Sequence, residues 1–210
     1  MAATHPTTLE PVTLEGRVVR LEPLALEHLD ALAEVGLDLE LWRWIPFPIR
    51  TKDGLRGYVE EALRDRAAGR AMPFVTVLQQ TGQPIGSTRF GNVDLANRRV
   101  EIGWTWVAQP WQRSAVNTEA KLLMLEHAFE RLGCNRVEFK TDSLNEQSRN
   151  ALRGIGAAEE GILRNHMVTE TDRLRHSVYY SVIRSEWPAV EAHLRERLSR
   201  PRRPTGTDER

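Results

Sequence analysis

The sequence predicts an α/β fold in which one mixed sheet carries helices on its faces. Short runs that alternate apolar and polar residues are interleaved with stretches whose apolar residues recur every three or four positions. Two runs are joined only by the turn "QTGQ", which is typical of a hairpin, whereas later runs are separated by amphipathic stretches, which is typical of crossovers. We expect one domain at 11–198, with a disordered N-terminus at 1–10 and a disordered basic tail at 199–210.

The first half of the chain contains a strand pattern followed by two helix patterns. Leu26, Leu29 and Leu32 recur at helical spacing until Gly36, and a second amphipathic stretch ends at Gly69. The segment between them, "LWRWIPFPI", is aromatic and broken by proline, so we expect it to be irregular. In chain order, the predicted elements are a strand at 12–24, a helix at 25–36, the irregular segment at 41–49, a helix at 52–69, and hairpin strands at 72–79 and 84–94.

The second half opens with the clearest strand pattern, at 98–110. Strict alternation assigns Val100, Ile102, Trp104 and Trp106 to one face, and Glu101, Gly103, Thr105 and Val107 to the other. We expect the tryptophan face to pack in the core or to line a substrate entrance. The remaining predicted elements are a helix at 116–133, a strand at 136–142, a helix at 145–156, strands at 158–169 and 174–187, and a last helix at 188–198.

Composition argues against several classes of function. Basic and acidic residues balance at 29 each, which argues against bulk electrostatic binding of nucleic acid. The lone cysteine, Cys134, provides neither a disulfide framework nor a four-ligand zinc site, so we expect a cytoplasmic location. No signal peptide is apparent, and no apolar run approaches the roughly 20 residues of a membrane span. We therefore expect neither nucleic acid nor a membrane as partner.

Four motifs in a fixed order carry a resemblance to a known family. They are "RLEPLALEHLDAL", "VEIGWTWVAQPWQRSAVNTEAKLLMLEHAFERLG", "RVEFKTDSLNEQSRNALRGIGAAEEGILRNH" and "HSVYYSVIRSEWP", which together span about 17–188. The sequence resembles the GNAT superfamily of acetyl-CoA-dependent N-acetyltransferases and, within it, the Rim-type (RimJ/RimL-like) branch, which includes acetyltransferases of ribosomal-protein N-termini. The resemblance implies a mostly antiparallel sheet of six to seven strands, splayed at its centre, with helices on both faces.

The resemblance also implies acetyl-CoA as cosubstrate, bound where the strand at 98–110 parts from the strand at 136–142. Backbone groups of Trp106 and Val107 are expected to pair with the pantetheine arm much as an added strand would. Asn145 is expected to contact the same arm. Asn145 also suits a helix N-cap, and one amide can serve both roles.

The pyrophosphate is expected at the loop before the following helix, where backbone N–H groups and the helix dipole attract anions. The loop residues are Gln112, Arg113, Ser114, Ala115, Val116 and Asn117. The family usually has glycine or another small residue where this chain has Ala115 and Asn117. Asn117 is acceptable because asparagine adopts left-handed or capping conformations more readily than most residues. An ordinary strand-to-helix turn is the alternative interpretation.

The implied reaction is direct attack of an amine in a ternary complex, without a metal. It needs a base near the amine and a proton donor near the leaving sulfur. Glu101 is the candidate base. Ser148, three residues after Asn145, is the candidate donor, because Leu152 stands where many members carry tyrosine. A structural carboxylate and a small helix-packing residue are the respective alternatives.

The acceptor site is expected to involve the irregular aromatic segment and the last two strands. Its candidate residues are Trp42, Trp44, His166 and His176; packing within the core or on the sheet is the alternative for each. By the same resemblance, the acceptor is a primary amine, most simply a protein or peptide N-terminus.

Two other functions and one assembly stay open at this point. A small-molecule amine such as an amino acid, polyamine or antibiotic is an alternative acceptor. A degenerate CoA-binding module without turnover is a second alternative, because Ala115, Asn117 and Leu152 depart from the usual pattern. A homodimer that pairs the strand at 177–183 and the helix at 190–198 of two copies is also left open.

Overall fold

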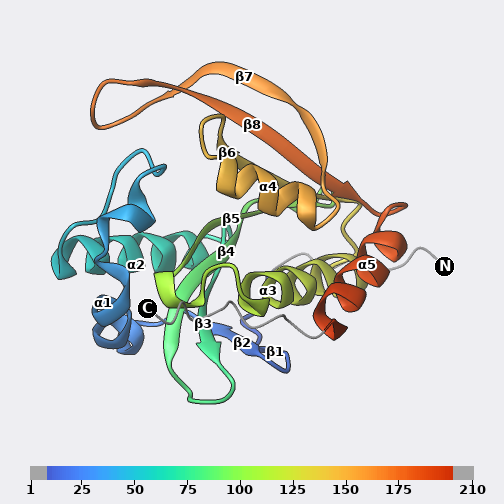
Figure 1. Cartoon of the computed structure of the whole chain (residues 1–210), viewed down its shortest axis with the longest axis horizontal. Helices are drawn as coiled ribbons and strands as arrows, with labels where there is room; N and C mark the ends of the chain where they lie inside the picture. Colours follow the sequence, from blue (N-terminus) through green and yellow to red (C-terminus); the bar gives the residue numbers. More distant parts are fainter. Residues whose placement is uncertain (1–8, 201–210) are drawn as a thin grey trace, which may run out of the picture.

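The sheet contains eight strands: β1 Leu14–Glu15, β2 Val19–Pro23, β3 Met72–Leu78, β4 Pro84–Asp94, β5 Arg99–Val107, β6 Arg136–Asp142, β7 Ala158–Val168 and β8 Leu174–Ile183. They lie in the order β1-β2-β3-β4-β5-β6-β8-β7 in the computed structural model, which describes residues 9–200 (Figure 1). Only β5 and β6 are parallel. The predicted mixed and mostly antiparallel sheet is confirmed. The predicted disordered ends lie outside the described residues at 1–8 and 201–210.

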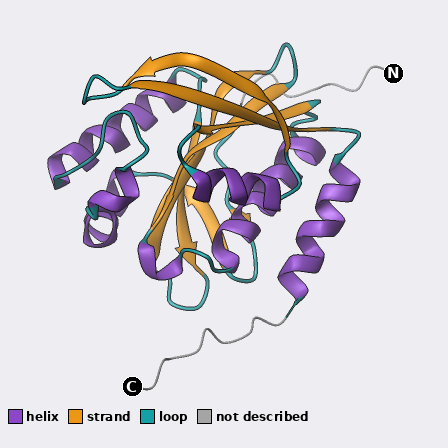
Figure 2. Ribbon diagram, turned by 45° about the horizontal axis from the view of Figure 1, so that its top comes forward, coloured by secondary structure: helices purple, strands orange, loops and turns teal. Residues whose placement is uncertain are grey.

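Helices cover both faces of the sheet (Figure 1, Figure 2). The helices are α1 Leu29–Gly36, α2 Lys52–Ala67, α3 Ala115–Glu126, which continues as a π-helical turn His127–Arg131, α4 Glu146–Gly154 and α5 Trp187–Ser199. Buried apolar residues of α3, α4 and α5 share one core cluster with the sheet, and those of α1 and α2 share a second. Two separate cores thus sandwich the sheet.

The strand count exceeds the predicted maximum of seven because residues 12–24 form two strands. Gly16 closes the turn between β1 and β2 by donating its N–H to the carbonyl of Val19 at 2.9 Å. A Cβ at Gly16 would lie 2.5 Å from Oε2 of Glu119 on α3. The same buried carboxylate accepts the N–H groups of Val18 and Val19 at 2.6 and 2.7 Å. The turn therefore anchors α3, whose N-terminus forms part of the candidate site.

A β-bulge in β5 interrupts the predicted alternation. Between the pairs that Gly103 and Trp106 form with β4, two β5 residues, Trp104 and Thr105, lie opposite Thr88 alone. Trp104 adopts a φ of 50°, in the left-handed region that a bulky residue rarely enters. The extra residue rotates everything after it to the opposite face.

The predicted tryptophan face is therefore wrong. Val100 packs in the core cluster of α3, whereas Trp106 packs in the cluster of α1 and α2. Trp104 also turns toward α2, where Tyr58 donates a hydrogen bond to its carbonyl oxygen at 3.1 Å. Both tryptophans consequently lie on the side of the sheet that carries Glu101, which strict alternation had placed opposite them.

The predicted splay at the centre of the sheet is confirmed. β5 and β6 pair only over their first three residues, Arg99 with Arg136, Val100 with Val137 and Glu101 with Glu138. Apart from the bulge at Trp104 and Thr105, residues 102–107 of β5 stay paired with β4 on one edge. On the other edge they have no partner strand among residues 9–200. Glu101 is thus the last paired residue before an open backbone edge.

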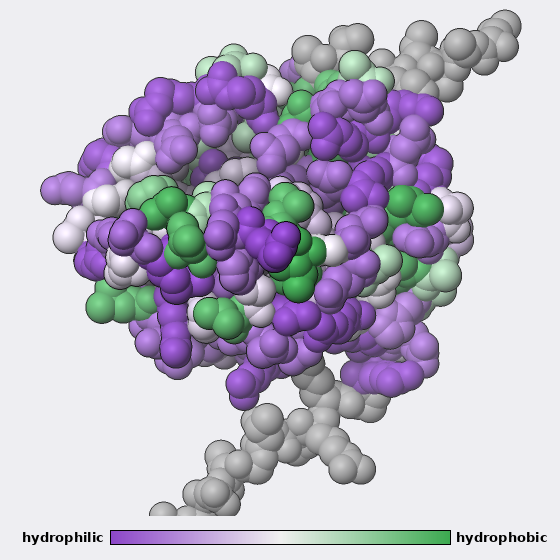
Figure 3. Space-filling model, turned by 90° about the horizontal axis from the view of Figure 1, so that it is seen from above, coloured by the Kyte–Doolittle hydropathy of each residue, from purple (hydrophilic) through white to green (hydrophobic). Residues whose placement is uncertain are grey.

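One end of the sheet is formed by β7, which is exposed along most of its length. Viewed from above, apolar residues lie in small separate groups on a largely hydrophilic surface (Figure 3). β8 is paired on both edges, with β6 and with β7, so it has no free edge for a second copy. The strand pairing suggested for a homodimer is therefore wrong, whereas a dimer formed in another way stays a prediction. No helix within residues 9–200 is long and apolar enough to cross a membrane.

Candidate active site

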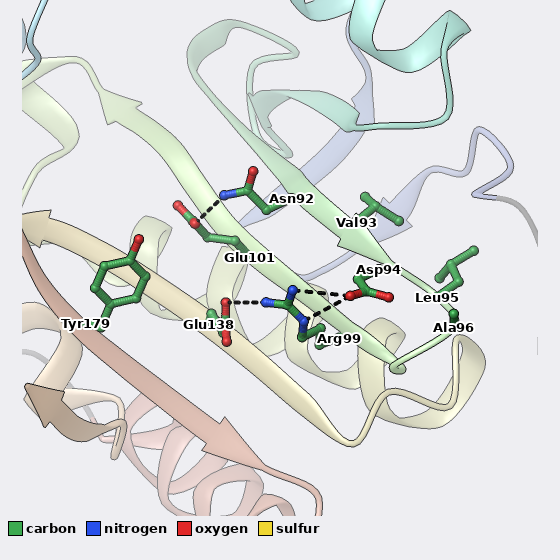
Figure 4. A pocket seen from close by; sticks show the side chains of 9 residues that line it. All are labelled: Asn92, Val93, Asp94, Leu95, Ala96, Arg99, Glu101, Glu138 and Tyr179. Atoms are coloured by element: carbon green, nitrogen blue, oxygen red, sulfur yellow. Dashed lines mark hydrogen bonds and ion pairs between the residues drawn. The ribbon is translucent and has the colours of Figure 1, made fainter. Parts of the chain in front are cut away.

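Glu101 is a buried carboxylate at the mouth of a cavity. Its side chain is 3% exposed, and its Oε2 accepts a hydrogen bond from Nδ2 of Asn92 at 2.7 Å (Figure 4). Nζ of Lys140 lies 3.7 Å from the same oxygen. The cavity, of about 660 Å³, is also lined by Glu138 and Tyr179. A carboxylate held by one hydrogen bond and one ion pair and facing a cavity is suited to accept a proton from a bound molecule.

His166 of β7 lies in the electrostatic environment of Glu101. Its Nδ1 is 2.9 Å from Oγ of Ser177, and its ring contacts Tyr179 edge to face with centroids 5.9 Å apart. Partial burial lowers the pKa of His166, as do Lys140 and Arg175, while Glu101 opposes them. The structure therefore brings together two of the predicted site residues.

His176 is not part of this group. Arg175 and Ser177, its neighbours on β8, lie on the Glu101 side of the sheet, so alternation directs His176 to the other side. Its Nδ1 accepts the backbone N–H of Asn165 at 2.9 Å. The expectation that both histidines line one acceptor site is thus wrong for His176. The cause is the two-residue period of a strand.

Trp42 belongs to the core. It is 1% exposed, its Nε1 donates to the carbonyl of Gly36 at 2.8 Å, and its ring packs at 5.6 Å from that of Trp106. It lines neither the cavity beside Glu101 nor the cavity beside Arg89, so the structural alternative, packing in the core, applies. Trp44 is partly exposed, and its carbonyl accepts from Nη1 of Arg175 at 3.4 Å.

The segment around Trp44 contacts the β7–β8 hairpin. Glu170 donates its backbone N–H to the carbonyl of Pro46 at 2.9 Å. Its carboxylate accepts two hydrogen bonds from Arg50, at 2.9 and 2.7 Å. The contacts connect two segments 120 residues apart in sequence. They place Trp44 beside β8, on which Arg175 and Tyr179 lie.

The predicted anion loop ends in a capped helix. Ser114 is the N-cap of α3, with its Oγ accepting the N–H of Val116 at 3.3 Å, and helix starts at Ala115. Arg113 adopts the left-handed conformation, at a φ of 55°. Asn117 lies in the first helical turn, so the expectation that it adopts a capping or left-handed conformation is wrong. The N–H groups of this first turn have no partner within the helix and point toward its N-terminal end.

Gln112 connects the end of β5 to α4. Its Nε2 donates to the carbonyl of Val107 at 2.9 Å, and its Oε1 accepts from Nε2 of Gln147 at 3.0 Å. The Val107 carbonyl therefore points away from β4, whereas the Trp106 carbonyl lies 2.2 Å from where a Cβ at Gly86 of β4 would be. Of the two backbone contacts predicted for the pantetheine arm, only that of Val107 faces the open edge.

Asn145 caps α4, as expected for one of its two predicted roles. Its Oδ1 accepts the backbone N–H of Ser148 at 3.0 Å, which leaves Nδ2 as a donor for a ligand. Ser148 lies in the first turn of α4 and is partly buried. Leu152 is 7% exposed and packs in the core. The position that carries tyrosine in many relatives therefore serves packing in this chain.

Three buried basic side chains were not predicted from the sequence, and one of them is Arg175 of β8, which is 6% exposed. Lys121 of α3 is 5% exposed and donates from Nζ to Oγ1 of Thr105 at 2.8 Å; burial lowers its pKa to about 7. Arg89 of β4 is 2% exposed. A charged residue within an otherwise apolar strand or helix face is the sequence signal that could have indicated these buried side chains. Within residues 9–200, no three His, Cys, Asp or Glu side chains gather as metal ligands.

Comparison with known proteins identifies the family. Residues 19–158 match the family described as "Acetyltransferase (GNAT) domain". The chain belongs to the GNAT acetyltransferase family. Its membership confirms the predicted class of enzyme, an acetyl-CoA-dependent N-acetyltransferase.

Individual relatives agree with this assignment. A Bacillus subtilis (strain 168) protein named "Putative ribosomal N-acetyltransferase YdaF" is 35% identical over 107 residues, which are 50% of this chain and 57% of that protein. A GCN5-related N-acetyltransferase from Brucella melitensis is 29% identical with a TM-score of 0.84, covering 95% of this chain and 91% of that one. RimJ of Mycobacterium smegmatis, solved with CoA-disulfide, shares the fold at a TM-score of 0.71 and 24% identity, over 93% and 96% of the two chains. The names of the YdaF and RimJ proteins agree with the resemblance to the Rim-type branch.

Proposed function

We propose that this GNAT enzyme acetylates a primary amine at the N-terminus of a protein or peptide. The observation that carries the proposal is the position of Glu101, buried beside a cavity at the point where β5 and β6 part. The name of the YdaF relative, a ribosomal N-acetyltransferase, supports a protein acceptor. His166 and the partly exposed Trp44 are the proposed acceptor contacts.

The chain's own groups fit acetyl-CoA, which supplies an activated acetyl group. The open edge of β5 offers the backbone of Val107 to the pantetheine arm, and Nδ2 of Asn145 is available from α4. The first turn of α3, with Ser114 and Arg113 before it, offers N–H groups and a positive dipole end to the pyrophosphate.

Proton transfer is assigned to two side chains. Glu101 accepts the proton that the attacking amine loses, directly or through a water molecule. Asn92 and Lys140 hold its carboxylate in place by a hydrogen bond and an ion pair. The Ser148 hydroxyl, in the first turn of α4, donates a hydrogen bond to the leaving sulfur. Side-by-side placement of both reactants supplies further acceleration.

The test is steady-state acetylation of N-terminal peptides by the intact protein. Glu101→Gln should lower kcat by roughly 100-fold or more, the contribution typical of a positioned base, and Ser148→Ala should lower it as well. Both variants should bind acetyl-CoA as the wild type does in calorimetric titration. Glu34→Gln, the same change at an exposed position of α1, is the matched control. Unchanged rates in both site variants would disprove the assigned roles.

A further inference from the structure

Arg89 presents a buried guanidinium whose Nε lacks a hydrogen-bond partner within the described residues. Its side chain is 2% exposed. The nearest carboxylate is that of Asp65 on α2, with Oδ2 at 3.9 Å from Nη1. Oδ1 of Asp65 already accepts two hydrogen bonds from Arg70, at 3.1 and 2.7 Å. Burying a cation with so few partners is costly, so its retention needs an explanation.

Two aromatic rings hold this guanidinium. Its Cζ lies 4.8 Å from the ring centroid of Tyr58 and 4.9 Å from that of Trp104. These contacts supply cation–π attraction. A guanidinium is planar by delocalisation, and its N–H groups can bind a carboxylate through two parallel hydrogen bonds. The ring contacts hold that plane in one orientation.

The backbone around Trp104 is adapted to this contact. Trp104 is the left-handed bulge residue of β5, a conformation that costs energy in a non-glycine residue. Gly91 of β4 makes room for the indole, because a Cβ there would lie 2.3 Å from Cζ3 of Trp104. The Tyr58 hydroxyl donates to the Trp104 carbonyl at 3.1 Å. Strain concentrated at one residue typically marks a functional position.

The guanidinium lines a cavity of about 230 Å³. Arg70, Asp65 and Asn92 also line it, so two arginines face one aspartate and the cavity carries net positive charge. Asn92 lines the larger cavity as well and donates to Glu101. The cationic cavity and the cavity beside the candidate base therefore share Asn92 and Val93 in their linings.

We infer that Arg89 binds a carboxylate of the acceptor while the amine of the same molecule lies at Glu101. The inference rests on the proposed function in one respect, which is that the molecule bound at Arg89 is identified as the amine acceptor. The carboxylate can belong to an acidic side chain next to a peptide N-terminus, or it can be the α-carboxylate of a free amino acid. These two sources share one chemistry and are separated by the choice of probe.

Calorimetric titration of the intact protein tests the site without turnover. The probes are the dipeptide amides Ser-Asp and Ser-Asn, and free serine against serinamide. In one of these pairs the carboxylate member should bind the wild type at least about tenfold more tightly, as expected for a charge-assisted pair. The preference for the carboxylate probe should disappear in Arg89→Gln. It should shrink in Arg89→Lys, because lysine keeps the positive charge but cannot donate two parallel hydrogen bonds. Arg56→Gln, an exposed change on α2, should retain it.

Two results would overturn the inference: equal affinity of the wild type for both members of each pair, or a preference that survives Arg89→Gln. The ratio of affinities for the two members of a pair does not depend on how much of the protein is folded. If Arg89→Gln does not fold, Arg89→Lys provides the test in its place. The same probes with acetyl-CoA separate the two proposals. Acetylation without carboxylate preference would remove the Arg89 site and leave the proposed function intact. If the wild type instead prefers the carboxylate probe through Arg89 but acetylates none of the probes, the Arg89 site would stand and the proposed function would be removed.

Discussion

The amide of Asn92 donates a hydrogen bond of 2.7 Å to the buried carboxylate of Glu101. It joins the last residue of β5 that pairs with β6 to a β4 residue with a φ of 46°. A left-handed asparagine at this point allows the side chain to reach back to its neighbour strand. Positioning of the candidate base therefore depends on an unusual local backbone.

Asn92→Gly should reduce kcat by roughly tenfold, because it removes a hydrogen bond to a charged group that contributes about 1.5–3 kcal/mol. Glycine accepts the positive φ, so the backbone is retained. Steady-state kinetics with a peptide acceptor measure the effect, and thermal unfolding monitors the fold. A kcat equal to that of the wild type would show that Asn92 does not position Glu101.

Arg113 provides a test of the anion loop. At a φ of 55°, Arg113→Val should lower the free energy of unfolding by about 1–2 kcal/mol and raise the KM for acetyl-CoA, because a β-branched residue resists the left-handed region. Arg113→Gly also loses the charge but accepts the conformation. The difference between the two variants, measured by denaturant unfolding and kinetics, isolates the backbone effect. Identical values for both would exclude a conformational role.

Stability should depend on pH through Lys121. Burial lowers its folded pKa to about 7 from 10.5, so between these values the unfolded chain binds more protons than the folded chain. The free energy of unfolding should then rise with pH over this window, by at most about 1.4 kcal/mol per pH unit. Lys121→Met should flatten this rise. Parallel slopes in urea titrations of both proteins at several pH values would contradict the assignment.

The environment of His166 can be checked by NMR. Burial, Lys140 and Arg175 lower its pKa, and Glu101 opposes them. The imidazole should therefore titrate below 6.5, and Glu101→Gln should lower the midpoint further by removing the opposing negative charge. A midpoint that does not respond to Glu101→Gln would place His166 outside the acceptor site.

Local sequence patterns determined most of the fold in advance. The strands β3, β4 and β6 and the cap at Asn145 follow from alternation, turn chemistry and capping preference. The bulge at Trp104 could not be predicted from these patterns. Strict alternation assumes that each strand residue faces one residue of the partner strand, whereas the extra residue of a bulge depends on contacts with β4 and α2.

Site residues could be predicted from the sequence where their role depends on local structure, such as capping a helix or lying on a strand. Asn145 is a capping residue, and Glu101 lies on a recognisable strand. Arg89 could not be placed, because its partners Tyr58 and Trp104 come from other elements and meet only in the folded chain. Trp42 was ambiguous for a related reason. An aromatic residue in an irregular segment is equally consistent with the core and with a pocket.

The central claim is tested most directly by mass spectrometry of a synthetic peptide incubated with acetyl-CoA and either wild-type protein or Glu101→Gln. The account predicts that the wild type acetylates the α-amine of the peptide, and that Glu101→Gln binds acetyl-CoA normally but forms product roughly 100-fold more slowly or worse. Equal rates for the two proteins, or no transfer by a wild type that binds acetyl-CoA, would contradict it.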